Sequence, residues 1–126
     1  EGESHQFNLL VTDIHPYVQD ERFAASEGVF GRRLVAGAFV FSAGLGLVAT
    51  NCVNAFSYGY DRLRFIRPVF INDTIHSVTT ITAKEDDPKR PDAGRVIERL
   101  QVVNQRGETV LAADHIYIVE RRKDRA

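Results

Sequence analysis

An acid, an imidazole and a proline stand close together near the start of the chain. Asp13 and His15 are two positions apart, and Pro16 follows directly. A carboxylate and an imidazole can together hold and activate a water molecule, because the carboxylate accepts a proton and the imidazole titrates near neutral pH. Asp is also common in turns, and a surface histidine is equally ordinary. The pair is therefore a candidate for acid–base chemistry. Whether its role is catalytic or structural depends on the elements that position it.

Short helices are expected on both sides of this pair. Residues 4–11 have apolar side chains at helical spacing, with Ser4 in position to cap the helix. That helix should end near Thr12, because Pro16 disfavours helical geometry at the residue before it. A second helix is predicted over residues 20–26, where Asp20 is a good N-cap.

A long apolar run follows at residues 34–50, in which only Ser42 and Thr50 are polar. The run is shorter than the roughly 20 apolar residues of a membrane span. Its three glycines, Gly37 among them, would weaken an isolated helix. We therefore expect a buried helix inside a soluble fold, surrounded by a sheet, with glycines that let backbone or a ligand come close.

The second half of the chain is rich in Val, Ile and Thr, which favour strands. Short polar turns separate the segments, including a hairpin turn at residues 104–107. This pattern predicts an α+β fold in which an antiparallel sheet curls around one long central helix. The expected strands cover residues 60–67, 73–84, 95–103 and 108–121.

Composition excludes several classes of partner. The chain of 126 residues suggests a single domain, 1–126, and its net charge of −1 gives no reason to expect nucleic acid or an anionic membrane.

The single cysteine, Cys52, allows no intrachain disulfide and is expected to be a small core residue. We expect a soluble intracellular protein. The histidines and acids show no metal-ligand spacing, so no metal is expected.

The order of the elements and several motifs resemble the MaoC-like dehydratases, the (R)-specific enoyl-CoA hydratase group of the hot-dog fold. Their signature runs roughly G-D-x-N-P-L-H-x-D, and "TDIHPYVQD" at residues 12–20 lies on it. The resemblance covers nearly the whole chain except a first strand, which we expect to precede residue 1. The other matching motifs are Phe23-Ala24, Phe30-Gly31, Ala36-Gly37 and "RFIRPVFINDT" at residues 64–74.

The resemblance implies an enzyme that adds water to a trans-2-enoyl thioester or removes it from a 3-hydroxyacyl thioester. Asp13 falls on the catalytic acid, and Gly37 on the residue whose N–H stabilises the enolate oxygen at a helix N-terminus. The substrate would be an acyl-CoA or acyl-carrier thioester, with no further cofactor. The family forms homodimers or dimers of dimers, in which the acyl tunnel is built. Tyr17, Phe30 and Ser42 would line the substrate site, and Arg32 and Arg33 are candidates for binding the carrier.

One mismatch with the family signature leaves three interpretations of the function open. The catalytic histidine of the resemblance falls on Val18, which has no proton chemistry, and His15 stands where the family has Asn. Either His15 supplies the imidazole from its nearby position, or the chain is a catalytically silent thioester-binding or assembly subunit. A hot-dog thioesterase is a third interpretation, although the signature around Asp13 is of the hydratase type.

Overall fold

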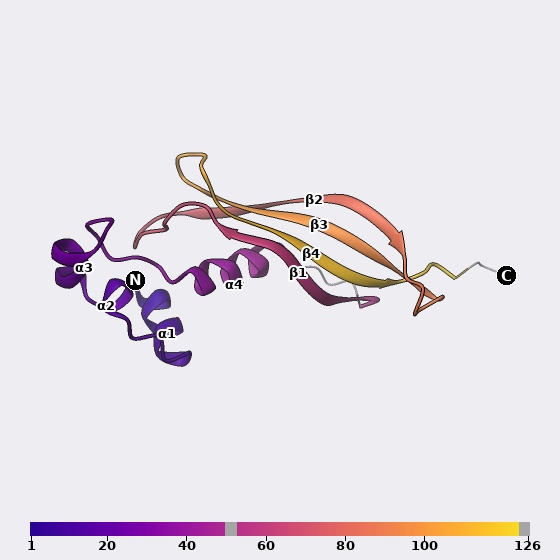
Figure 1. Cartoon of the computed structure of the whole chain (residues 1–126), viewed down its shortest axis with the longest axis horizontal. Helices are drawn as coiled ribbons and strands as arrows, with labels where there is room; N and C mark the ends of the chain where they lie inside the picture. Colours follow the sequence, from indigo (N-terminus) through magenta and orange to yellow (C-terminus); the bar gives the residue numbers. More distant parts are fainter. Residues whose placement is uncertain (50–52, 124–126) are drawn as a thin grey trace.

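The computed structural model describes residues 1–49 and 53–123. Within these residues, four helices precede a four-stranded antiparallel sheet of order β1-β4-β3-β2 (Figure 1). This architecture confirms the predicted α+β hot-dog arrangement. The helices are α1 (Gly2–Leu10), α2 (Pro16–Gln19), α3 (Glu21–Glu27) and α4 (Gly37–Leu47), and the strands are β1 (Ala55–Phe65), β2 (Ile75–Asp86), β3 (Ala93–Asn104) and β4 (Thr109–Glu120).

Helix α4 lies along one face of the sheet, and α1, α2 and α3 cluster beyond its N-terminal end (Figure 1). The sheet continues well past the C-terminal end of α4. The Ser77 hydroxyl of β2 donates a hydrogen bond of 2.8 Å to the Gly44 carbonyl of α4. Beneath the helix, Leu100, Val102 and Leu111 of β3 and β4 are fully buried and form the core. Strands β3 and β4 therefore provide the floor on which α4 is placed.

The central helix is shorter than the predicted 34–50. Leu34 forms a bridge with Phe70, and the Val35 N–H donates to the Val69 carbonyl at 2.8 Å, so this segment is extended rather than helical. The prediction of burial on every face is also wrong for the described chain. Val40 and Gly44 face the sheet, whereas Leu47 on another face is 58 % exposed. A uniformly apolar helix can thus be half exposed in a single chain.

Some of the predicted helix ends and strand starts agree with the structure, and others do not. Asp20 caps α3 as expected, because its Oδ1 accepts a hydrogen bond from the Phe23 N–H at 3.0 Å. Ser4 does not cap α1, which begins at Gly2 without a side-chain cap; Ser4 is buried instead. Strand β1 begins at Ala55, earlier than the predicted 60–67. Cys52, the expected core cysteine, lies outside the described residues, as does Thr50.

Among the described residues, no helix is long and apolar enough to cross a membrane. Within the same part of the chain, no group of three or more His, Cys, Asp or Glu side chains could hold a metal ion.

The close packing of α4 on the sheet predicts the effect of a substitution at Gly44. A Cβ atom there would lie 2.6 Å from Cγ2 of Val102, which is fully buried. Gly44→Ala should therefore lower the free energy of unfolding by about 1–3 kcal/mol through overpacking. Gly46→Ala on the same helix is the control, since nothing lies within 4 Å of its Cβ and the change should stabilise by up to about 1 kcal/mol. Urea denaturation of both variants checks this, and equal effects would contradict it.

Candidate active site

Asp13 sits in a turn that reverses the chain after α1. Thr12 has a φ of +59°, the left-handed region that favours glycine. Glycine is the residue that the family signature has at this position, so the geometry accounts for that preference. The Asp13 N–H then donates to the Asn8 carbonyl at 2.8 Å, and the half-buried Asp13 carboxyl accepts from the His15 N–H at 3.3 Å. The acid is thus held by backbone contacts on both sides.

His15 has a structural role that its spacing did not reveal. It is the N-cap of α2, a one-turn helix that was not predicted, with Pro16 at the first helical position. The Tyr17 N–H donates to Nδ1 of His15 at 3.2 Å, and the two rings lie 4.7 Å apart. Because Nδ1 accepts this hydrogen bond, the neutral ring has its proton on Nε2. The exposed His15 ring therefore presents an N–H donor to its surroundings.

Val18 lies in α2 and is half-buried. It shares this single helical turn with Tyr17, just after the residues that form the Asp13 turn. An isopropyl side chain can neither accept nor donate a proton, so the imidazoles near this turn are those of His15 and of His5, whose Nδ1 lies 2.9 Å from Oε1 of Gln19 at the end of α2.

A cavity of about 540 Å³ opens at the N-terminal end of α4. We call it the Gly37 cavity, and it is lined among others by Phe30, Leu34, Gly37, Phe65, Pro68 and Val110. The first backbone N–H groups of a helix have no acceptor within the helix and lie at its positive end. A Cβ on Gly37 would lie 2.9 Å from the Phe65 ring. The missing side chain lets the Phe65 ring pack directly against the first residue of α4 in the wall of this cavity.

The Asp13 turn and the Gly37 cavity are joined by a hydrogen bond. The Leu34 N–H, in the cavity wall, donates to the Tyr17 carbonyl of α2 at 2.9 Å. The segment with Asp13 and His15 is therefore fastened beside the cavity. Neither of these two side chains, nor Tyr17, is among the residues that line it in the single chain.

The other predicted substrate-binding residues are placed in different surroundings. Phe30 lines the Gly37 cavity, whereas Ser42 is exposed on α4 and does not. Arg32 is exposed, and its guanidinium lies 4.0 Å from the centre of the Phe70 ring. The Arg33 side chain is only 13 % exposed and pairs with two carboxylates, Glu1 at 3.1 Å and Glu21 at 3.5 Å. The Arg33 charge is therefore engaged by the fold, and Arg32 is the better placed of the two arginines.

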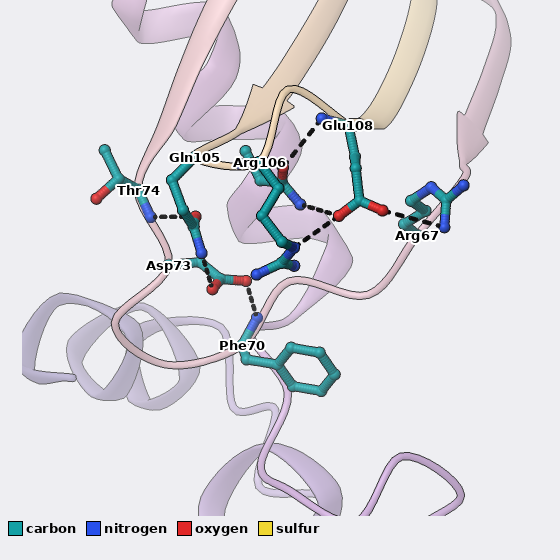
Figure 2. A network of polar contacts seen from close by, with 8 residues as sticks. Arg67, Phe70, Asp73, Thr74, Gln105, Arg106 and Glu108 are labelled. Atoms are coloured by element: carbon teal, nitrogen blue, oxygen red, sulfur yellow. Dashed lines mark hydrogen bonds and ion pairs between the residues drawn. The ribbon is translucent and has the colours of Figure 1, made fainter.

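A polar network fixes the loop at residues 70–74, which directly follows the wall segment 65–69 of the Gly37 cavity (Figure 2). The Asp73 carboxyl accepts hydrogen bonds from the Phe70 N–H and from Gln105, both at 2.9 Å. Burial raises the pKa of Asp73, but these two hydrogen bonds and the positive charges of Arg106 and Arg32 together outweigh it, and the pKa lies below its usual value. Nearby, Glu108 pairs with Arg67, which also lines the cavity, at 3.4 Å. Sequence reasoning did not find this network; the Asx-type turn at "IND" before β2 was its only signal.

Comparison with known proteins places this geometry in a family. The family model described as "MaoC like domain" matches residues 1–102. The chain belongs to the MaoC-like domain family. A monoamine oxidase regulatory protein from Archaeoglobus is 31% identical, with a TM-score of 0.86, and the match covers 97% of this chain and 82% of that one.

Two further relatives refine the picture of this MaoC-like domain. Protein MaoC of Klebsiella aerogenes is 40% identical over 72 residues, which are 56% of this chain but only 22% of that protein. The chain thus spans about a fifth of the length of that curated relative. An (R)-hydratase from A. caviae involved in PHA biosynthesis is 24% identical, with a TM-score of 0.77, and the match covers 92% of this chain and 84% of that one. At that identity the likeness shows the hot-dog fold alone.

Proposed function

We propose that this MaoC-like domain adds water to a 2-enoyl thioester or removes it from a 3-hydroxyacyl thioester. The observation that supports the proposal is the Gly37 cavity, an apolar chamber that ends at the N–H groups of α4, with the Asp13 turn fastened to its wall. An apolar chamber suits an acyl chain, and helix N–H groups suit an oxygen on which negative charge develops.

The contacts of Asp13 and His15 suggest a different role for each side chain in the proposed reaction. In hydration, the water oxygen bonds to C3 of the enoyl group, one water proton goes to the Asp13 carboxylate, and charge moves to the thioester oxygen beside Gly37. Asp13 then delivers that proton to C2, which restores the carboxylate. A neutral imidazole is a very weak acid, so the Nε2–H of His15 serves to orient the water rather than to protonate carbon.

A homodimer belongs to this proposal. Strand β1 is an edge of the sheet, and an open edge is usually paired or covered. Large aromatic side chains are exposed along it: Phe56 is 62 % exposed and Phe65 60 % exposed. Since Phe65 also lines the Gly37 cavity, a partner on this edge would complete that cavity.

Arg32 is the proposed contact for the phosphates of the carrier. Arg32→Ala should raise KM for crotonyl-CoA about tenfold, as the loss of one charge-assisted hydrogen bond of ~1.4 kcal/mol would, with little change in kcat. The matched substrate is crotonyl-pantetheine, which lacks the nucleotide phosphates and should show no change in KM. Steady-state kinetics on both thioesters test the assignment, and an equal rise in both KM values would contradict it.

The second candidate is a catalytically silent subunit that binds acyl thioesters. Val18, in place of the family's histidine, favours it. A further point in its favour is the regulatory function named for the Archaeoglobus relative. Such a subunit would retain the Gly37 cavity and bind acyl-CoA without turnover.

A further inference from the structure

A second cavity, of about 350 Å³, lies between the C-terminal end of α4 and the sheet. We call it the His115 cavity. Leu45 and Val48 close it from the helix side, and Ser57, Glu98, His115 and Tyr117 form its polar floor. These four residues come from β1, β3 and β4, far apart in sequence, and strand register brings them together: Glu98 is paired with His115, and Ser57 with Tyr117. The cavity is thus built by the sheet rather than by a single loop.

The polar floor is ordered by a short hydrogen bond. The Ser57 hydroxyl and Nε2 of His115 are 2.7 Å apart. His115 is only 5% exposed, and its ring contacts those of Tyr60 and Tyr117 at centroid distances of 4.4 and 3.9 Å, tilted by 34° and 33°. Burial lowers the pKa of His115, so the ring is neutral at neutral pH. A neutral imidazole and a hydroxyl offer both a donor and an acceptor to a neutral ligand group.

Glu98 and Tyr117 add two further polar groups on the same side. Burial raises the pKa of the Glu98 carboxyl, and it raises that of the Tyr117 hydroxyl as well. Both shifts follow from partial removal of water from the floor. A ligand that filled the cavity would complete that removal, so it must itself provide hydrogen bonds or incur the cost of unpaired polar groups.

One face of α4 runs past both cavities. Gly37, Phe41 and Leu45 recur at a spacing of four residues and therefore share that face. Gly37 lines the first cavity and Leu45 the second. Between them, the Phe41 ring packs edge to face on Tyr60 of β1, with centroids 4.9 Å apart. The Phe41–Tyr60 pair is therefore the partition that an extended ligand must pass.

We propose that the His115 cavity takes the far end of the acyl chain and selects chains that end in a neutral hydroxyl group; the inference rests on the function proposed above. Gly37 and Gly46 are nine residues apart on α4, which corresponds to ~14 Å. An extended chain advances about 1.2 Å per bond, so roughly 12 carbon atoms span the distance.

The chemistry of the floor separates a hydroxyl from the other chain ends. A methyl end would desolvate Ser57, His115 and Tyr117 without replacing their hydrogen bonds, which is how a polar pocket rejects an analogue that lacks the hydroxyl. A carboxylate end would face Glu98 and a neutral imidazole, with no cation to compensate. A hydroxyl can both accept and donate, as this floor requires.

Binding of two saturated thioesters tests the proposal without any need for turnover. Calorimetry would compare 12-hydroxydodecanoyl-CoA with dodecanoyl-CoA on the wild-type protein and on Ser57→Ala and Tyr117→Phe. The control is Tyr58→Phe, the same loss of a hydroxyl on β1, at a residue that is 57% exposed and outside the cavity lining. Thermal melts show that each variant is folded.

We expect wild-type protein and Tyr58→Phe to bind the hydroxylated thioester about tenfold more tightly than dodecanoyl-CoA. Ser57→Ala and Tyr117→Phe should lose most of that preference and bind dodecanoyl-CoA at least as tightly as the wild type, because the hydroxyl that a methyl end would desolvate is gone. Equal binding of the two thioesters by the wild type would overturn this inference and leave the proposed function intact. Failure of both thioesters to bind would also overturn this inference, while hydration of crotonyl-CoA would decide the proposed function separately.

Discussion

Asp13→Asn is expected to lower kcat/KM for a 2-enoyl-CoA by about 10²–10⁴-fold, the usual contribution of a general acid–base group. An amide oxygen can still accept the hydrogen bond that the Asp13 carboxyl receives from the His15 N–H, so the turn should persist. What disappears is the group that takes a proton from water and gives it to C2. The assay is the initial rate of hydration at several substrate concentrations, and an Asn variant with wild-type kcat would contradict the assigned role.

His15→Asn is the matched variant for this experiment. Asn is a good helix N-cap, so it can accept from the Tyr17 N–H and preserve α2 while it removes the imidazole. Because His15 orients water and carries no proton to carbon in this account, we expect a smaller loss than for Asp13→Asn. A loss as large as that of Asp13→Asn would assign the proton transfer to His15 instead.

Gly37→Ala should reduce kcat/KM by at least about 100-fold, which is the scale of losing one oxyanion donor. The new Cβ would lie 2.9 Å from the Phe65 ring, so that this ring would have to move within the cavity in which the thioester oxygen is proposed to bind. Displacement of that ring should also cost about 1–3 kcal/mol of stability.

Gly44→Ala separates these two effects, because it too introduces a clash on α4 but outside the Gly37 cavity. It should lose comparable stability and retain its kcat/KM per folded molecule. The measurement pairs hydration kinetics with urea denaturation of both variants. If Gly44→Ala lost activity as strongly as Gly37→Ala, the effect would lie in the helix as a whole and not at the oxyanion position.

Local sequence signals predicted those parts of the fold that depend on neighbouring residues. The cap at Asp20, the hairpin turn at 104–107 and the long last strand all follow from short-range chemistry, and the structure has them. The one-turn helix α2 was missed because His15 caps it, and His is an unusual N-cap. The central helix was predicted too long, because apolar composition cannot tell a helical residue such as Val40 from the extended Val35.

The site was less accessible to sequence reasoning, since it depends on register across the sheet. His115 is buried, and its bond to Ser57 joins residues 58 positions apart, which no local sequence pattern indicates. Arg33 and Arg32 are neighbours in sequence, yet only the structure shows that Arg33 is paired with Glu1 and Glu21. The catalytic roles of Asp13, His15 and Gly37 stay predictions.

Hydration of crotonyl-CoA by the purified wild-type protein tests the central claim most directly. The reaction is followed as the loss of the conjugated enoyl-thioester absorbance, with a longer 2-enoyl-CoA as second substrate and Asp13→Asn as the blank. We expect turnover of at least one of the two thioesters by the wild type, and at least about 100-fold less by the variant. Wild-type protein that binds acyl-CoA in calorimetry but leaves the absorbance unchanged would contradict it, and would identify the domain as the silent binding subunit that Val18 suggests.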